Sequence, residues 1–179
     1  NLSTGKDFND HLKWIKFSGM SWSGDGFYYN AFPIPEEGKE LSQANQSSKV
    51  YYHKLGTVQD EDILIFSDID NPQISPYSST TSDGRFLMIY RTKGTYGNSL
   101  MVKDLDQPDS RFITVINDYK SETSVVDHIN GKLLAITDRN AGKKKVVLID
   151  LNNPKVSEWK TLIPEKRPIE TANGQFSVS

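Results

Sequence analysis

The sequence contains no cysteine and only three histidines. The absence of cysteine excludes disulfide bonds and thiolate zinc sites, and it is compatible with either an oxidising or a reducing compartment. No apolar run approaches the roughly 20 residues that a membrane-spanning helix needs. No basic stripe is present, so neither nucleic acid nor a membrane is an expected partner. The composition, with 36% hydrophobic and 25% charged residues, is typical of a soluble globular protein, cytoplasmic or periplasmic.

Helical periodicity is nearly absent too. No window keeps apolar residues at i, i+3, i+4 and i+7 over three turns. Short runs rich in aromatic and β-branched residues recur instead, which is typical of strands. The first of these runs begins at Trp14, and the next three cover residues 27–32, 50–55 and 63–66. Together they predict one four-stranded antiparallel sheet.

The remainder of the sequence repeats this unit. Asp-Gly or Asn-Gly dipeptides, the strongest short signals for a β-hairpin, recur roughly every 45 to 60 residues, a period in the range of propeller blades. They are Asp25-Gly26, Asp83-Gly84, Asn130-Gly131 and Asn173-Gly174. We therefore predict an all-β protein, with blades at residues 11–68, 74–118 and 123–164 and the start of a fourth blade at 165–179.

Four-stranded sheets that bury their faces on one another are typical of β-propellers. Three blades cannot close a ring, because propellers need about four to eight. The chain also starts at Asn1, without an initiator methionine or a signal peptide. We therefore expect a segment of a longer protein, and we expect this segment in isolation to self-associate through uncovered blade faces.

One stretch has the outline of a serine nucleophile motif. Residues 19–23 approach the G-x-S-x-G pattern, but the last glycine is replaced by Ser23. That motif also requires a strained turn from a strand into a helix, whereas a hairpin and another strand follow here. The interpretation we favour is a strand with a buried Trp22.

The polar residues indicate no metal or cofactor. The spacings of the three histidines match no zinc motif, and His53, on a predicted strand, is expected to be a hydrogen-bonded structural residue. The acidic run 60–62 is predicted to be a solvated loop. Residues 68–71 lack the glycine and the distal glutamate of a calcium loop, so we predict a turn there.

The exact residues of the first predicted blade are more informative than its pattern of strands and turns. Residues 12–22 and 25–29, followed by the string Y-Y-H-x-L-G-T-x-Q-x-E-D over residues 51–62, closely resemble the prolyl oligopeptidase (prolyl endopeptidase) family. Later pieces match in the same order, at residues 82–86, 91–98 and 159–165. The resemblance covers essentially the whole chain and implies central blades of a seven-bladed propeller.

Membership of this family implies a function. The family joins the propeller to an α/β-hydrolase domain, in which a Ser-His-Asp triad cleaves peptides after proline. The resemblance assigns none of the triad to this chain, so no catalytic residue and no activity of the segment alone are expected. The propeller would cap the active site and admit short peptides. The alternative is a propeller without catalysis that binds proteins or peptides on its end loops.

One residue of this chain matches a substrate-binding position of the family. Arg91 ends the second strand of the second predicted blade and precedes the loop 92–98. The family has an arginine there that faces the cavity between the two domains and helps to bind the peptide. The resemblance thus implies that Arg91 binds substrate, and the competing interpretation is an exposed arginine at a strand end.

Overall fold

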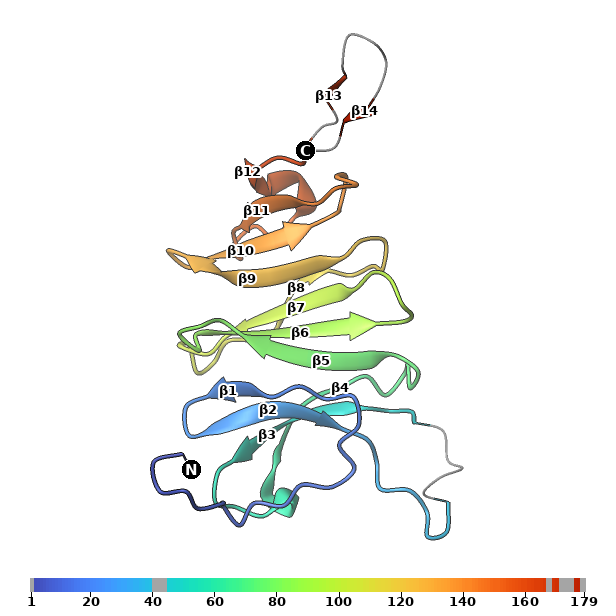
Figure 1. The fold of residues 1–179 in the computed structure, drawn as a ribbon, viewed down its shortest axis with the longest axis vertical. Helices are drawn as coiled ribbons and strands as arrows, with labels where there is room; N and C mark the ends of the chain where they lie inside the picture. The colour runs from blue at the N-terminus through green and yellow to red at the C-terminus, as the bar shows by residue number, and fades with distance from the viewer. Residues whose placement is uncertain (1, 40–44, 167–168, 171–175, 178–179) are drawn as a thin grey trace. The chain divides into compact units, whose positions relative to one another are not determined.

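The structure, a computed structural model, describes residues 2–39, 45–166, 169–170 and 176–177. These residues form β-strands and two short 3₁₀ turns, and the chain divides into two compact units, Asn1–Lys120 and Ser121–Ser179 (Figure 1). Within the described part of the chain, no helix is long and apolar enough to cross a membrane.

The first unit contains two four-stranded antiparallel sheets, each with its strands in chain order. The first sheet consists of β1 Ser21–Ser23, β2 Gly26–Ala31, β3 Lys49–Lys54 and β4 Ile63–Ser67. The second consists of β5 Ser75–Thr80, β6 Phe86–Thr92, β7 Ser99–Asp104 and β8 Ile113–Ile116. A 3₁₀ turn, Gln59–Glu61, precedes β4.

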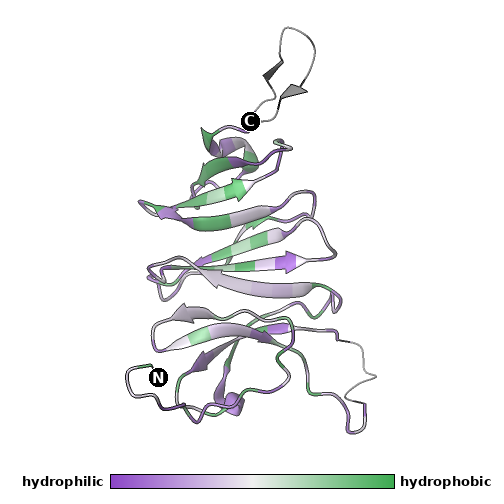
Figure 2. Cartoon of the chain, viewed as in Figure 1, coloured by the Kyte–Doolittle hydropathy of each residue, from purple (hydrophilic) through white to green (hydrophobic). Residues whose placement is uncertain are grey.

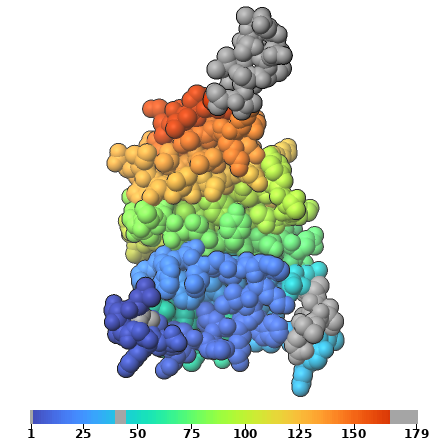
Figure 3. All heavy atoms as spheres, viewed as in Figure 1, coloured from blue at the N-terminus to red at the C-terminus, as the bar shows by residue number. Residues whose placement is uncertain are grey.

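The two sheets of the first unit share an apolar core. Tyr28 and Val50 of the first sheet pack in one buried cluster with Leu87 and Ile89 of the second. Hydrophobic residues fill the middle of β6 and β7, while the end of β6 is hydrophilic (Figure 2). Side chains of the first sheet lie directly against β5 (blue against green in Figure 3). Burying these aliphatic and aromatic groups is the main force that joins the sheets.

The second unit contains the third four-stranded antiparallel sheet. Its strands are β9 Thr123–Ile129, β10 Lys132–Thr137, β11 Lys145–Ile149 and β12 Lys160–Ile163, and the 3₁₀ turn Val156–Glu158 precedes β12. A separate pair follows, β13 Ile169–Glu170 with β14 Phe176–Ser177. The all-β class and the three four-stranded antiparallel sheets predicted from the sequence are thus confirmed.

The predicted hairpin turns differ in detail. Asn130 and Gly131 have φ of 51° and 77° and connect β9 to β10 as the Asn-Gly signal predicts. In the first hairpin, Gly24 takes the positive φ of 58°. Gly26 lies in β2, where an added Cβ would come within 2.1 Å of the carbonyl oxygen of His53. Asn173-Gly174 lies outside the described residues.

Two expectations about the start of the chain are wrong. The run at Trp14 is not a strand, because the first strand begins only at Ser21. Trp14 and Phe17 have φ of 57° and 55°, a left-handed conformation that no strand contains. Trp22 is not buried either: it is 56% exposed, because β1 is a short edge strand. Its ring lies edge-on to Phe27, with the centroids 5.2 Å apart.

Candidate functional site

Arg91 lies near the end of β6, where its guanidinium is surrounded by hydrogen-bond acceptors. Nε donates to Ser99 Oγ at 2.9 Å, and one terminal nitrogen donates to Asp68 Oδ2 at 3.1 Å. The other terminal nitrogen donates to Asn117 Oδ1 at 3.3 Å. The side chain is only 16% exposed, so Arg91 is not an ordinary exposed arginine at a strand end.

These acceptors come from three separate strand ends. Asp68 follows β4 of the first sheet, Ser99 opens β7 and Asn117 follows β8. Antiparallel pairing places Ser99 opposite Arg91. Sequence reasoning found Arg91 but missed its three acceptors, since only the packing of the first sheet against the second brings Asp68 to it. Residues 68–71 do form the predicted turn, with Asn71 Nδ2 donating to Asp68 Oδ1 at 2.9 Å.

The arrangement leaves Arg91 able to bind a ligand. A guanidinium has five N–H donors in a fixed planar fork, and the described residues accept from only three of them. The ion pair with Asp68, itself 10% exposed, fixes the orientation of the fork. Two N–H groups therefore remain for an acceptor such as a peptide carbonyl.

A second polar cluster lies inside the first sheet. His53 of β3 is fully buried, with Nδ1 2.7 Å from Asp62 Oδ1 and Nε2 2.9 Å from Asp10 Oδ1. Asp10 Oδ1 also accepts from the Gly56 N–H at 2.6 Å, and Asp62 Oδ2 accepts from the Tyr29 hydroxyl at 2.6 Å. We call these side chains, His53, Asp10, Asp62 and Tyr29, the histidine cluster.

The surroundings of His53 favour the charged form of its imidazole. Each ring nitrogen faces a carboxylate, and an ionised carboxylate can only accept, so both hydrogen bonds form when both nitrogens carry a proton. Burial by itself opposes that charge, but the hydrogen bonds to Asp10 and Asp62 outweigh it and raise the pKa of His53. The Gly56 N–H and His53 together lower the pKa of Asp10. Burial, aided by Asp62, raises the pKa of Tyr29, so its hydroxyl remains a donor.

This cluster is structural, and it corrects one prediction. His53 is fully buried and cannot contact a substrate, so the expectation of a hydrogen-bonded structural histidine is confirmed. The prediction that residues 60–62 form a solvated acidic loop is wrong for Asp62, whose side chain is only 2% exposed. Asp60 and Glu61 are exposed as expected. The sequence does not distinguish these three acids, because which of them is buried depends on where the 3₁₀ turn ends.

The sequence and the fold of this chain are similar to those of known proteins. The family model described as prolyl oligopeptidase, N-terminal beta-propeller domain, matches residues 1–174. The chain belongs to the prolyl oligopeptidase family. The prolyl endopeptidase of Elizabethkingia meningoseptica is 38% identical over 180 residues, which cover 98% of this chain and 25% of the relative. A dual function macrocyclase-peptidase of Galerina marginata is 30% identical over 92% of this chain and 23% of its own length.

Solved structures of the prolyl oligopeptidase family have the same fold. Prolyl oligopeptidase B from Galerina marginata, bound to a 35mer hydrolysis and macrocyclization substrate, superimposes with a TM-score of 0.82 at 30% identity. That match covers 93% of this chain and 24% of the other. The chain therefore spans about a quarter of the length of the prolyl oligopeptidases it matches, and it corresponds to part of their N-terminal propeller.

Proposed function

We propose that this chain is the propeller portion of a serine endopeptidase that cleaves short peptides after proline. The observation that carries the proposal is the match of residues 1–174 to the N-terminal propeller of prolyl oligopeptidases. The partner is an α/β-hydrolase domain of the same parent chain. The propeller segment caps that domain and filters its substrates, with blades at residues 11–68, 74–118 and 123–164. The segment alone has no peptidase activity.

Arg91 is the residue of this segment that we propose to bind the peptide. Three acceptors orient its guanidinium and two N–H groups remain for the ligand. A hydrogen bond from a charged donor to a peptide carbonyl is short and strong. Because Arg91 would hold the substrate without taking part in bond cleavage, it contributes to binding more than to chemistry.

Substitution of Arg91 in the parent protein tests both proposals. We expect Arg91→Ala to raise KM more than it lowers kcat, with a loss of about ten- to a hundredfold in kcat/KM on a fluorogenic Gly-Pro peptide. Arg85→Ala is the matched control: Arg85 also forms an ion pair, with Asp104 at 2.9 Å, but it directly precedes the strand that Arg91 nearly ends. Unchanged kinetics for Arg91→Ala would contradict a role in substrate binding.

The second candidate is a propeller that binds peptides or proteins on its end loops without catalysis. Fold alone does not separate the two, because propellers serve many functions. The parent open reading frame does: a G-x-S-x-G elbow a few hundred residues downstream supports the peptidase. A chain that ends after the propeller supports the binding module.

We also propose that the isolated segment self-associates. Propeller blades bury their apolar faces on neighbouring blades, and contiguous apolar patches above a few hundred Å² tend to find partners. A symmetric dimer is the commonest closed solution. Light scattering after size exclusion, over a tenfold concentration range, measures the mass. A value that stays at the 20.2 kDa of the monomer would contradict this proposal.

A further inference from the structure

Residues 7–20 lead into β1 and are attached to the first sheet mainly by hydrogen bonds; we call them the entry segment. All of its residues are described, and they include no strand residue and no buried residue. Trp14 and Phe17 have φ of 57° and 55°, a costly conformation that persists only where the surroundings impose it. Few buried contacts and local strain are typical of segments that open easily. The entry segment therefore depends on its polar bonds to stay in place.

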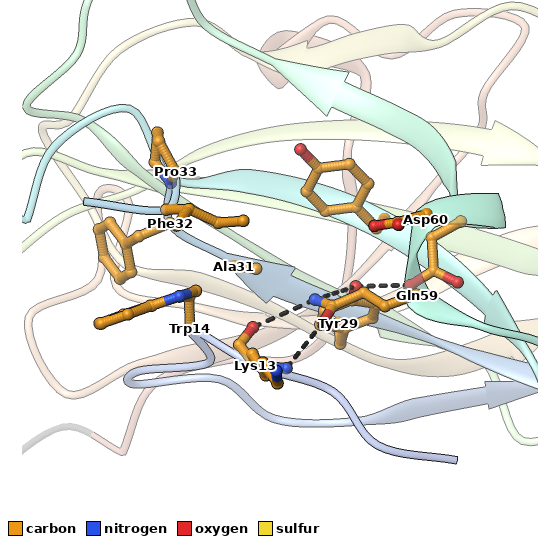
Figure 4. A pocket seen from close by; sticks show the side chains of 11 residues that line it. Lys13, Trp14, Tyr29, Ala31, Phe32, Pro33, Gln59 and Asp60 are labelled. Atoms are coloured by element: carbon orange, nitrogen blue, oxygen red, sulfur yellow. Dashed lines mark hydrogen bonds between the residues drawn. The ribbon is translucent and has the colours of Figure 1, made fainter. Parts of the chain in front are cut away.

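Three of these bonds join neutral groups. The side-chain amide of Gln59 accepts from the Lys13 N–H at 2.8 Å and donates to the Lys13 carbonyl at 3.1 Å (Figure 4). The Phe32 N–H donates to the Trp14 carbonyl at 3.2 Å. Amides do not titrate near neutral pH. These three bonds therefore do not respond to pH by themselves.

Asp10 forms the attachment that depends on charge. Its Oδ1 accepts from the Gly56 N–H at 2.6 Å and lies 2.9 Å from Nε2 of the fully buried His53. Its Oδ2 is buried and has no hydrogen-bond partner among the described residues. An ionised carboxylate can only accept, so the bond to His53 requires a proton on Nε2. The protonation of one side chain in β3 therefore decides how strongly the entry segment is attached.

A neutral His53 can donate to only one of its two carboxylates. Asp62 is the better acceptor, because it lies 2.7 Å from Nδ1 and is 2% exposed, whereas Asp10 is 11% exposed. Asp62 also directly precedes β4 and accepts from the Tyr29 hydroxyl. Leaving the more buried carboxylate without its donor costs more, so the remaining proton stays on Nδ1. Nε2 and Asp10 Oδ1 are then two acceptors that face each other, and they repel.

His53 is the group of this cluster that changes charge near neutral pH. The titratable groups around it are Asp10 of the entry segment, Asp62 after the 3₁₀ turn, Tyr29 of β2 and Tyr51 of β3. Burial, aided by Asp62, raises the pKa of both tyrosines, so they stay neutral. A backbone N–H and then His53 lower the pKa of Asp10, so it stays ionised. Burial opposes the charge of His53, but its two carboxylate partners outweigh burial and raise its pKa above 6.5.

We propose that His53 is a pH-dependent latch on the entry segment. With both ring nitrogens protonated, Asp10 is held and the entry segment lies against the first sheet. Loss of the Nε2 proton turns this attraction into repulsion, Asp10 moves toward water, and the attachment of the segment loosens while the strands keep their pairing. The latch needs no ligand. It rests on bonds between the first sheet and its own entry segment, so it does not depend on the proposed function.

Hydrogen exchange read by mass spectrometry tests the latch in the full-length parent protein, where the complete propeller is present. The reporters are the Lys13, Phe32 and Gly56 amides, whose bonds attach the entry segment. Exchange is followed from about pH 6 to about pH 9.5, and each rate is divided by the intrinsic rate at that pH. We expect protection to fall about ten- to a hundredfold as pH rises through the folded-state pKa of His53, because the segment opens as one unit once a charged hydrogen bond is lost.

Two further measurements make the result specific. Amides that pair β6 with β7 should keep their protection, because the cluster does not touch those strands. Exchange of the ring C2 hydrogen of His53 reports the pKa of the imidazole independently of the amides. The midpoint of that titration should coincide with the midpoint of the loss of protection.

Three variants separate the latch from the simple loss of a bond. His53→Gln has no titrating ring, so protection of the reporters should not depend on pH. Asp10→Asn should remove most of the fall, because a carboxamide can accept from the charged ring and donate to the neutral ring. His11→Gln is the matched control: it removes an exposed histidine of the same segment and should leave the pH profile unchanged.

Four results would overturn the proposal. Constant protection while the His53 ring titrates would show that Asp10 stays attached to the neutral ring. A ring that does not titrate up to about pH 9.5 would exclude a latch in this range. An equal fall in β6 and β7 would mean that the whole fold weakens, and a fall that persists in His53→Gln would assign the effect to another group. If Asp10→Asn does not fold, the unsubstituted protein and His53→Gln decide the question.

Discussion

The two sheets of the first unit share a topology but are stabilised by different chemistry. The middle strands of the second sheet bury aliphatic and aromatic side chains, and its charged pairs lie at strand ends. The first sheet buries the imidazole of His53 between two carboxylates. One carboxylate, on Asp10, belongs to the segment that precedes β1. Equivalent sheets of one architecture can therefore depend on different forces, and among the described residues only the first buries a histidine between two carboxylates.

The two kinds of interaction also differ in how they fix neighbouring segments of the chain. Apolar burial is non-directional and scales with the area removed from water. The histidine cluster is directional, because each ring nitrogen has one acceptor. It fixes Asp10 against Gly56, while Gln59 fixes Lys13, so the segment before β1 is tied to the first sheet by polar bonds.

The largest expected effect is loss of a carboxylate from the histidine cluster. Asp62→Ala leaves a buried imidazolium with one partner and removes the acceptor of the Tyr29 hydroxyl. Breaking a buried pair in this way costs about 3–5 kcal/mol. Denaturant unfolding of the variant and the unsubstituted chain measures this difference. Asp60→Ala, a change at an exposed residue two positions away, should alter the free energy of unfolding by no more than about 0.5 kcal/mol. Equal losses in both variants would contradict a stabilising role of the histidine cluster.

A change of pH should lower the free energy of unfolding by less than Asp62→Ala does, because His53 and its two carboxylate partners remain in place. The raised pKa of His53 stabilises the fold fully below the ordinary value of 6.5, and this contribution is lost as pH rises through the folded-state pKa. The lowered pKa of Asp10 stabilises it above the ordinary value of 3.8, and this is lost as pH falls through the folded-state pKa. We expect the free energy of unfolding to be highest between these values.

A histidine variant sharpens the pH test. His53→Gln removes the titrating group but keeps side-chain hydrogen-bonding capacity, so the decline above neutral pH should disappear from a series of denaturant titrations. A decline that persists unchanged in His53→Gln would assign the effect to another group.

The smallest expected effect comes from an apolar side chain of the second sheet. Ile89 is fully buried in the cluster with Leu87, and Ile89→Val should cost about 0.5–1.5 kcal/mol by thermal or denaturant unfolding. Because no charge is involved, this loss should be the same at every pH at which the chain is folded. A loss that varies with pH would mean that titrating groups contribute to the stability of the second sheet as well.

Much of the local structure could be predicted from the sequence. Asn130-Gly131 predicts its hairpin because both residues must adopt positive φ, and few residues other than Asn and Gly do so easily. The repeated runs predict three four-stranded sheets because strand formation depends on short-range pattern. The predicted strand at Trp14 was wrong, because an aromatic run is also compatible with an irregular segment that hydrogen bonds to Gln59 and Phe32 hold in place.

By itself, the sequence determined the strands, their antiparallel order, the family and the position of Arg91, because these depend on neighbouring residues or on a long, specific string. Only the tertiary structure decided which acid of residues 60–62 is buried, since Asp62 pairs with His53 whereas Asp60 has no partner among the described residues. It also decided that Asp10 reaches His53 and that Asp68 reaches Arg91. Burial and pairing across tens of residues depend on how sheets pack, and local pattern does not encode that packing.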